Sequence, residues 1–176
     1  MIAATDASFY KATPALFRQL PYCLTVAPDT SAEATQVVSD LADRLGAKVL
    51  YLDAAEHDGL MASVETTPSI LAAILLTVAR RGAWKEISKV AGAQFDASTR
   101  LAAESAAALA QATLSNRDNV LRWLDLFAQE LEAWRARIAS GEATELEGAF
   151  ERALAARNDW MSNRGKAPLL VDTPAL

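Results

Sequence analysis

Histidine and cysteine each occur only once in this 176-residue sequence, as His57 and Cys23. A single cysteine cannot form an intramolecular disulfide, and a zinc site would need more Cys or His ligands than the chain contains. Glycine is also sparse, and the 7 glycines form neither a G-x-G-x-x-G nor a G-K-[ST] motif. The sequence therefore predicts no metal site and no phosphate-binding loop in this chain.

Positive charge is in deficit as well, with 17 basic against 22 acidic side chains and a net charge of −5. An acidic chain without a basic block is poorly suited to bind nucleic acid or anionic lipid. No uninterrupted apolar run reaches the roughly 18 residues of a membrane span, and no secretory leader is visible. We expect a cytoplasmic protein with no nucleic-acid or membrane partner.

The chain after residue 20 has the pattern of a β-α-β unit. Pro21–Ala27 is a short run of β-forming residues, and Lys48–Leu52 is a second one. Between them, Thr30 and Glu33 have the spacing of a helix capping box, and Gly46 stands where a helix is expected to end. The intervening helix carries one apolar face, formed by Val37, Val38, Leu41 and Leu45. Such a unit pairs its strands in parallel.

This predicted strand pair is incomplete by itself. Parallel sheets are normally covered on both faces, whereas two strands and one helix leave both edges and one face open. We therefore expect that another chain completes the sheet or that further strands precede residue 1.

The rest of the chain is predicted to be helical. Asp53 and Glu56 repeat the capping spacing, so a helix should begin near Ala54. Pro68 should kink or break this helix, because proline lacks the backbone N–H and clashes with the preceding turn. Gly82 should end the apolar segment that follows.

Further helices are expected over four segments: Trp84–Val90, 98–112, Asn116–Ala139 and Ala143–Met161. The fold class is therefore mainly α, with a short N-terminal β-α-β unit followed by an all-helical bundle. The predicted division is a β-α-β part over 1–53, a helical domain over 54–164 and an extended tail over 165–176.

The segment that opens at Asn116 has apolar residues spaced alternately four and three apart, which is the a/d pattern of packed helices. These residues are Val120, Leu124, Phe127, Leu131, Trp134 and Ile138. The stripe could face only partners within the chain. A fold of few helices has limited interior, however, so we expect a homodimer with a large apolar interface.

The stretch LFRQLPYCLTVAPDTSAEATQVVSDLADRLGAKVLYLDAAEHDGLMASV resembles the middle of a prephenate or arogenate dehydrogenase. The resemblance continues through AGAQFDASTR and LSNRDNVL and covers about residues 13–164. It implies that the strand pair is the end of a Rossmann domain, followed by a dimerisation bundle like the C-terminal domain of 6-phosphogluconate dehydrogenase. The glycine fingerprint of that family is not in this chain. NAD or NADP would therefore be bound only when the chain is joined to a separate or upstream Rossmann domain.

The resemblance implies a substrate-binding role, and no catalytic role, for four residues: His57, Arg100, Asn116 and Arg117. His57 belongs to an E-H-D motif, but the later S-H-x-P-H segment of the family corresponds to Glu65–Ser69, which has no histidine. The alternative for His57, which we favour, is a half-exposed residue in the first turn of a helix. Asn116 and Arg117 match N-R-[ED] and either line the same cleft or only cap the long helix.

The segment QFDASTR resembles the family pattern F-R-D-x-T-R, whose arginines suit a dicarboxylate because guanidinium groups bind carboxylates bidentately. Phe95, Thr99 and Arg100 match the pattern, but Asp96 occupies the first arginine position and would repel an anionic substrate. Arg100 is the remaining candidate for carboxylate binding. The alternative is an ion pair of Arg100 with Asp96 or Glu104.

Two functions remain open. The first is the C-terminal dimerisation and substrate-pocket portion of a prephenate or arogenate dehydrogenase-like oxidoreductase of tyrosine biosynthesis, not competent alone. The second is a stand-alone, non-catalytic helical dimer that acts as a binding or interaction module. The absent histidines and Asp96 favour the second function, so whether the chain is an enzyme stays uncertain at this point.

Overall fold

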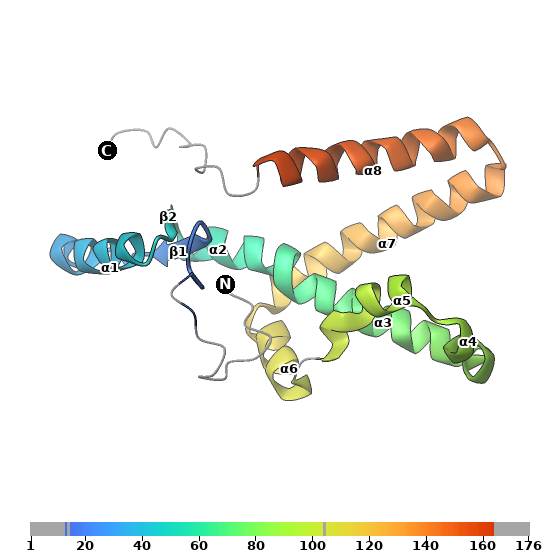
Figure 1. Cartoon of the computed structure of the whole chain (residues 1–176), viewed down its shortest axis with the longest axis horizontal. Coiled ribbons are helices and arrows are strands. Elements are labelled where there is room, and N and C mark those ends of the chain that lie inside the picture. The colour runs from blue at the N-terminus through green and yellow to red at the C-terminus, as the bar shows by residue number, and fades with distance from the viewer. Residues whose placement is uncertain (1–12, 14, 104, 164–176) are drawn as a thin grey trace. The chain divides into compact units, whose positions relative to one another are not determined.

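The computed structural model describes residues 13, 15–103 and 105–163. These residues form helices and one two-stranded sheet (Figure 1), which confirms the mainly α prediction. They divide into two compact units. One contains the described residues up to His57 and those from Glu142 onward, and the other is Asp58–Gly141. The predicted tail over 165–176 lies outside the described residues.

The predicted β-α-β unit is present. Strands β1 (Pro21–Thr25) and β2 (Lys48–Leu52) pair in parallel, with Pro21 opposite Lys48 and Thr25 opposite Leu52. The second strand has the predicted bounds. The first is shorter than predicted at its C-terminal end, because β2 ends at Leu52 and offers no partner beyond Thr25.

The helix between the strands, α1 (Ala32–Arg44), is capped one residue later than predicted. The Ser31 hydroxyl oxygen accepts a hydrogen bond from the backbone N–H of Ala34 at 3.1 Å, so the capping role assigned to Thr30 is wrong. Both side chains can cap a helix, and the extended backbone of Ser31 decides between them. Gly46 ends this region with φ of 76°, in the left-handed conformation predicted for it.

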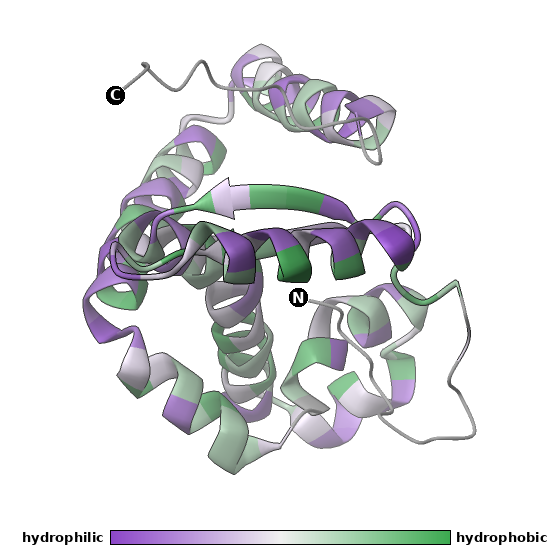
Figure 2. Cartoon of the chain, turned by 90° about the vertical axis from the view of Figure 1, so that its left-hand side faces the viewer, coloured by the Kyte–Doolittle hydropathy of each residue, from purple (hydrophilic) through white to green (hydrophobic). Residues whose placement is uncertain are grey.

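The apolar face of α1 is not the face that packs on the sheet. α1 contacts β2, and its buried residues are Ser39 and Ala42. Val37 and Leu41 are 63% and 56% exposed. Figure 2, coloured by hydropathy, shows apolar positions along this helix. Among the described residues, the β-α-β unit therefore has an exposed apolar flank on α1, and neither β1 nor β2 pairs with a third strand.

One long helical run follows β2 and is divided by a π-helical turn. It consists of α2 (Ala54–Met61), η2 (Ala62–Thr66) and α3 (Thr67–Arg81), with Gly82 as the C-cap. The Asp53 carboxylate accepts a hydrogen bond from the Glu56 N–H at 2.8 Å, as the capping pattern predicted. Pro68 does not interrupt the run. It falls in the first turn of α3, directly after the π turn, where a missing N–H is tolerated.

This run, Ala54–Arg81, contains an 18-residue window apolar enough to cross a membrane, of which 28% is buried. The helix meets this criterion by length and composition only, and core helices of soluble proteins meet it too. Glu65 and Pro68 interrupt its apolar character. The expectation that the chain has no membrane partner stays a prediction.

The π turn is the packing centre of the helical unit. η2 contacts α3 as well as α6 (Ala106–Ser115) and α7 (Arg117–Ser140). Ala62 and Thr67 are fully buried there, and Val120 of α7 is 2% exposed. The Thr67 hydroxyl donates to the Ala62 carbonyl at 2.6 Å, which satisfies a buried acceptor at the π turn.

The other elements are α4 (Trp84–Val90), α5 (Ala93–Thr99), η3 (Arg100–Ala103) and α8 (Ala143–Asn163). α4 has the predicted bounds, and α7 and α8 lie within two residues of theirs. The stretch 98–112 is mostly helical, as predicted, but it is not one helix. That stretch contains the end of α5, then η3, and most of α6, which begins after the N-cap Ser105.

The described chain buries few large apolar side chains. Its buried hydrophobic residues are Ala42, Ala47, Ala62, Ala72, Val120 and Ala149. Val120 is the largest of these six, whereas Leu131 and Ile138 of the predicted stripe are 64% and 63% exposed. Exposing large apolar side chains to water is unfavourable, so the surface around Leu131 and Ile138 is suited to contact with another protein.

Candidate functional site

His57 lies in the first turns of α2 and is half-buried. Its backbone N–H donates to the Asp53 carbonyl at 2.9 Å. Asp53 also caps the helix through Glu56. This environment matches the alternative in which His57 is a half-exposed residue in the first turn of a helix. His57 belongs to the unit that contains the strands, whereas Arg100, Asn116 and Arg117 belong to the helical unit.

Asn116 connects the start of α7 to α2. Its side-chain N–H donates to the Asp58 carbonyl at 2.6 Å, and its side-chain oxygen accepts from Asn119 at 2.8 Å. The oxygen of Asn119 in turn accepts from Arg122 at 3.1 Å. Both polar ends of the Asn116 amide are thus engaged within the protein. Its predicted role in substrate binding remains a prediction, as does that of the neighbouring exposed Arg117.

Trp123 adds a second link of the same kind. Its indole N–H donates to the Gly59 carbonyl at 3.3 Å, one residue after the carbonyl that Asn116 binds. The N-cap residue of α7, Asn116, and one residue within α7, Trp123, therefore donate hydrogen bonds to two consecutive carbonyls of α2. The sequence did not reveal this network. The residues that it joins are far apart in the chain, with 58 positions between the partners of the Asn116 bond, so no local pattern signals their contact.

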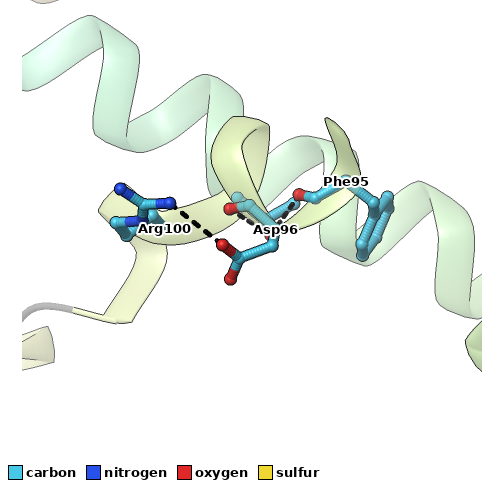
Figure 3. Close-up of polar contacts among 4 residues, drawn as sticks. Phe95, Asp96 and Arg100 are labelled. Atoms are coloured by element: carbon cyan, nitrogen blue, oxygen red, sulfur yellow. Dashed lines mark hydrogen bonds and ion pairs between the residues drawn. The ribbon is translucent and has the colours of Figure 1, made fainter. Parts of the chain in front are cut away.

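Arg100 forms an ion pair with Asp96. Figure 3 shows the contact, in which Arg100 Nη2 lies 3.0 Å from Asp96 Oδ2. The side chains are 68% and 72% exposed, respectively. The ion-pair alternative with Asp96 is therefore present in the structure, and Glu104 lies outside the described residues. Exposed pairs of this kind are weak, so the guanidinium stays accessible to a competing carboxylate.

The turn of the β-α-β unit does not fit a dinucleotide. Between β1 and α1 the chain runs through Pro28, Asp29, Thr30 and Ser31, without glycine. A pyrophosphate needs close approach to backbone N–H groups at a helix N-terminus, and Asp29 would repel it there. Among the described residues there is likewise no cluster of three or more His, Cys, Asp or Glu side chains suited to a metal ion. The expectations of no phosphate-binding loop and no metal site in this chain stay predictions.

Residues 53–152 match the family described as "Prephenate dehydrogenase, dimerization domain". This match covers more than half of the chain. The chain belongs to this family. The resemblance stated from the sequence is thereby confirmed, and the matched region begins at Asp53, the residue that caps α2.

Curated relatives of the prephenate dehydrogenase family agree with this assignment. The chain is 26% identical to a prephenate dehydrogenase of Bacillus subtilis over 166 residues, which are 90% of this chain and 45% of that protein. It is also 26% identical to a cyclohexadienyl dehydrogenase of Zymomonas mobilis over 145 residues, which are 81% and 50% of the two chains. The chain thus spans about half the length of the curated relatives it matches.

Solved structures of the family have the same fold. An arogenate dehydrogenase of Synechocystis aligns with a TM-score of 0.76 at 21% identity, over 82% of this chain and 54% of that one. A prephenate dehydrogenase of Aquifex aeolicus, solved with hydroxyphenyl propionate and NAD+, aligns with a TM-score of 0.77 at 21% identity, over 82% and 51%. At this identity the likeness concerns the fold alone.

Proposed function

We propose that this chain is the C-terminal dimerisation and substrate-pocket portion of a prephenate or arogenate dehydrogenase-like oxidoreductase. The observation that supports this proposal most is the order of two features along the chain. A parallel strand pair with an open apolar flank directly precedes a region that matches the family's dimerisation domain. On this proposal the chain does not catalyse the reaction alone, because its described residues do not fit a dinucleotide.

The first partner in this proposal is a second copy of the chain. The stripe on α7 is exposed at Phe127, Leu131 and Ile138. A surface hollow of about 410 Å³ lies beside it, lined by Trp123, Leu126, Phe127, Gln129 and Glu130. α8 also exposes Phe150 and Leu154. Apolar surface on two long helices supports an obligate type of homodimer interface.

The second partner is a Rossmann domain, upstream or separate, that carries NAD or NADP. It would extend the open edges of β1 and β2 and cover Val37 and Leu41 on the exposed flank of α1. Parallel sheets require such cover on both faces. The nicotinamide would supply the hydride chemistry, while this chain contributes substrate contacts, for which we propose His57, Arg100, Asn116 and Arg117. A cytoplasmic location follows from this role in biosynthesis.

Reconstitution tests the proposal directly. The chain is mixed with the nucleotide-binding domain of a family member, NAD+ or NADP+, and prephenate or arogenate, and nicotinamide reduction is followed at about 340 nm. We expect reduction only when both proteins are present, and a lower rate with Arg100→Ala than with the control Arg135→Ala. Formation of a stable complex without any reduction would overturn the enzymatic proposal.

A non-catalytic dimer is the second candidate. The observation that favours it is the engagement of the predicted site: Arg100 is paired with Asp96, and both ends of the Asn116 amide are occupied. This candidate predicts a dimer in sedimentation that forms no complex with a family nucleotide-binding domain. Binding of that domain through the strand edges would contradict it.

A further inference from the structure

We propose that Pro68 and the extra residue of the π turn Ala62–Thr66 are a matched pair, which together fix the register in which α2 meets α7. This inference goes beyond the proposed function, because it concerns how the helix that carries the E-H-D motif is set and does not depend on catalysis. Its starting point is that a π turn divides the helical run Ala54–Arg81 directly before this proline.

The π turn accommodates one residue more than an α turn. The backbone N–H of Thr67 bonds to the Ala62 carbonyl, and the Thr67 hydroxyl donates to the same oxygen at 2.6 Å. These partners are five positions apart, whereas an α-helix closes its backbone bonds over four. If an α turn replaced the π turn while α3 stayed in place, every residue of α2 would move one position around the helix, by about 100°. The π turn therefore determines which residues of α2 face α7.

Pro68 provides a local cause for the π turn. Proline has no backbone N–H, and in the interior of an α-helix its ring clashes with the carbonyl four residues earlier. For Pro68 that carbonyl belongs to Val64, which lies inside the π turn. The wider turn relieves this clash, and Pro68 falls in the first turn of α3, where no N–H is required.

The contacts of α2 with α7 depend on this register. The hydrogen bonds from α7 and its N-cap reach the carbonyls of Asp58 and Gly59. A Cβ at residue 59 would lie 3.6 Å from Arg122 Nη2, which is ordinary contact distance, so a longer side chain there would collide with that group. With an α turn in place of the π turn, Leu60 would take the position of Gly59. The π turn thus places a glycine where α7 approaches α2.

Deletion of Val64, which is 62% exposed, tests the match between proline and turn. In the wild-type background, the deletion leaves Pro68 without the extra residue, so either the proline clashes in an α turn or α2 shifts by one position. We expect the folding equilibrium constant, from urea denaturation at one fixed chain concentration, to fall about 100-fold. In the Pro68→Ala background, an α turn is allowed and keeps α2 in its present register. The same deletion should then leave that constant nearly unchanged.

Two further measurements make the test specific to the register. The indole N–H resonance of Trp123, observed by NMR, should keep its position in the double variant, because the bond to the Gly59 carbonyl is retained. The matched control is deletion of Ala73, an exposed residue within the regular α-helix of α3. No extra residue is removed there, so Pro68→Ala should not rescue this deletion.

The inference is supported when Pro68→Ala rescues the deletion of Val64 and does not rescue the deletion of Ala73. If the single deletion of Val64 abolishes folding, a folded double variant supports the inference and an unfolded one contradicts it. Equal losses from the Val64 deletion in both backgrounds, a deletion that is harmless in both, rescue of both deletions, or a displaced Trp123 resonance in the double variant would each overturn it.

Discussion

The two halves of α7 carry the same apolar spacing and lie in opposite environments. In the first half, Val120 is 2% exposed against η2, and Trp123 is bonded to the Gly59 carbonyl. In the second half, Leu131 and Ile138 are 64% and 63% exposed. A heptad pattern therefore specifies that a stripe will be covered without specifying by which chain. Among the described residues, the stripe is buried at Val120, half-buried at Leu124 and Trp134, and exposed at Phe127, Leu131 and Ile138.

This contrast separates what stabilises the chain by itself from what is available for assembly. The first half packs on the π turn, where Ala62 and Thr67 are fully buried. Close packing and the hydrogen bond of Thr67 leave no room for larger or charged side chains there. The second half has charged pairs beside its apolar residues, such as Arg137 with Glu130 at 3.0 Å. Substitutions in the first half should act on folding, and those in the second on association.

The largest effect is expected for Val120→Asp. An unpaired carboxylate at this buried position should reduce the free energy of unfolding by about 3–5 kcal/mol. Urea denaturation followed by circular dichroism measures the change, at one fixed chain concentration because association contributes to apparent stability. The control is Leu121→Asp on the adjacent exposed position. Equal stability of the two variants would show that Val120 is not in the packing centre.

The next effect concerns association. Leu131→Glu should raise the dissociation constant of the proposed homodimer at least about 100-fold, because a charge would be transferred into an apolar interface. Sedimentation velocity at micromolar concentrations measures the change from dimer to monomer. Ala136→Glu introduces the same charge on the opposite face of α7 and should leave the dimer intact. A wild-type monomer, or equal behaviour of the two variants, would contradict the assignment of the second half.

The elements that the sequence predicted well are those with local signals at both ends. Lys48–Leu52 and Trp84–Val90 are bounded by turn-forming residues, and Gly46 and Gly141 adopt the left-handed conformation that ends helices. The alanine-rich segment 98–112 was predicted as helical without its division into α5, η3 and α6, since alanine favours helix in any context and does not mark where one helix ends and the next begins.

Other features depend on contacts that no local pattern encodes. The π turn at Ala62–Thr66 is accommodated by Val120 and by bonds from α7 to α2 carbonyls. For the site, the spacing of Asp96 and Arg100 on one helical face anticipated their ion pair. The engagement of Asn116 with Asp58 was out of reach, because the two residues are 58 positions apart.

A smaller effect is expected inside the π turn. Thr67→Val removes the buried hydroxyl that donates to the Ala62 carbonyl at 2.6 Å, so that this acceptor loses its partner. The free energy of unfolding should fall by about 1–3 kcal/mol. Thr77→Val is the matched control, since it removes an exposed hydroxyl bonded to the Ala73 carbonyl at 2.8 Å, which water can replace. Equal losses in both variants would show that the π turn gains nothing special from Thr67.

The smallest effect is expected for the link that holds the first half of α7 to α2. Asn116→Ala removes the 2.6 Å bond to the Asp58 carbonyl and should lower the free energy of unfolding by about 1 kcal/mol. Amide exchange in the first turns of α7 should accelerate, while exchange around Leu131 stays unchanged. Gln36→Ala, which removes an exposed side-chain bond to Asp40 at 2.7 Å, is the control. If Asn116→Ala instead leaves stability and amide exchange unaltered but weakens substrate binding in the reconstituted assay, Asn116 contributes to substrate binding and not to the link between α7 and α2.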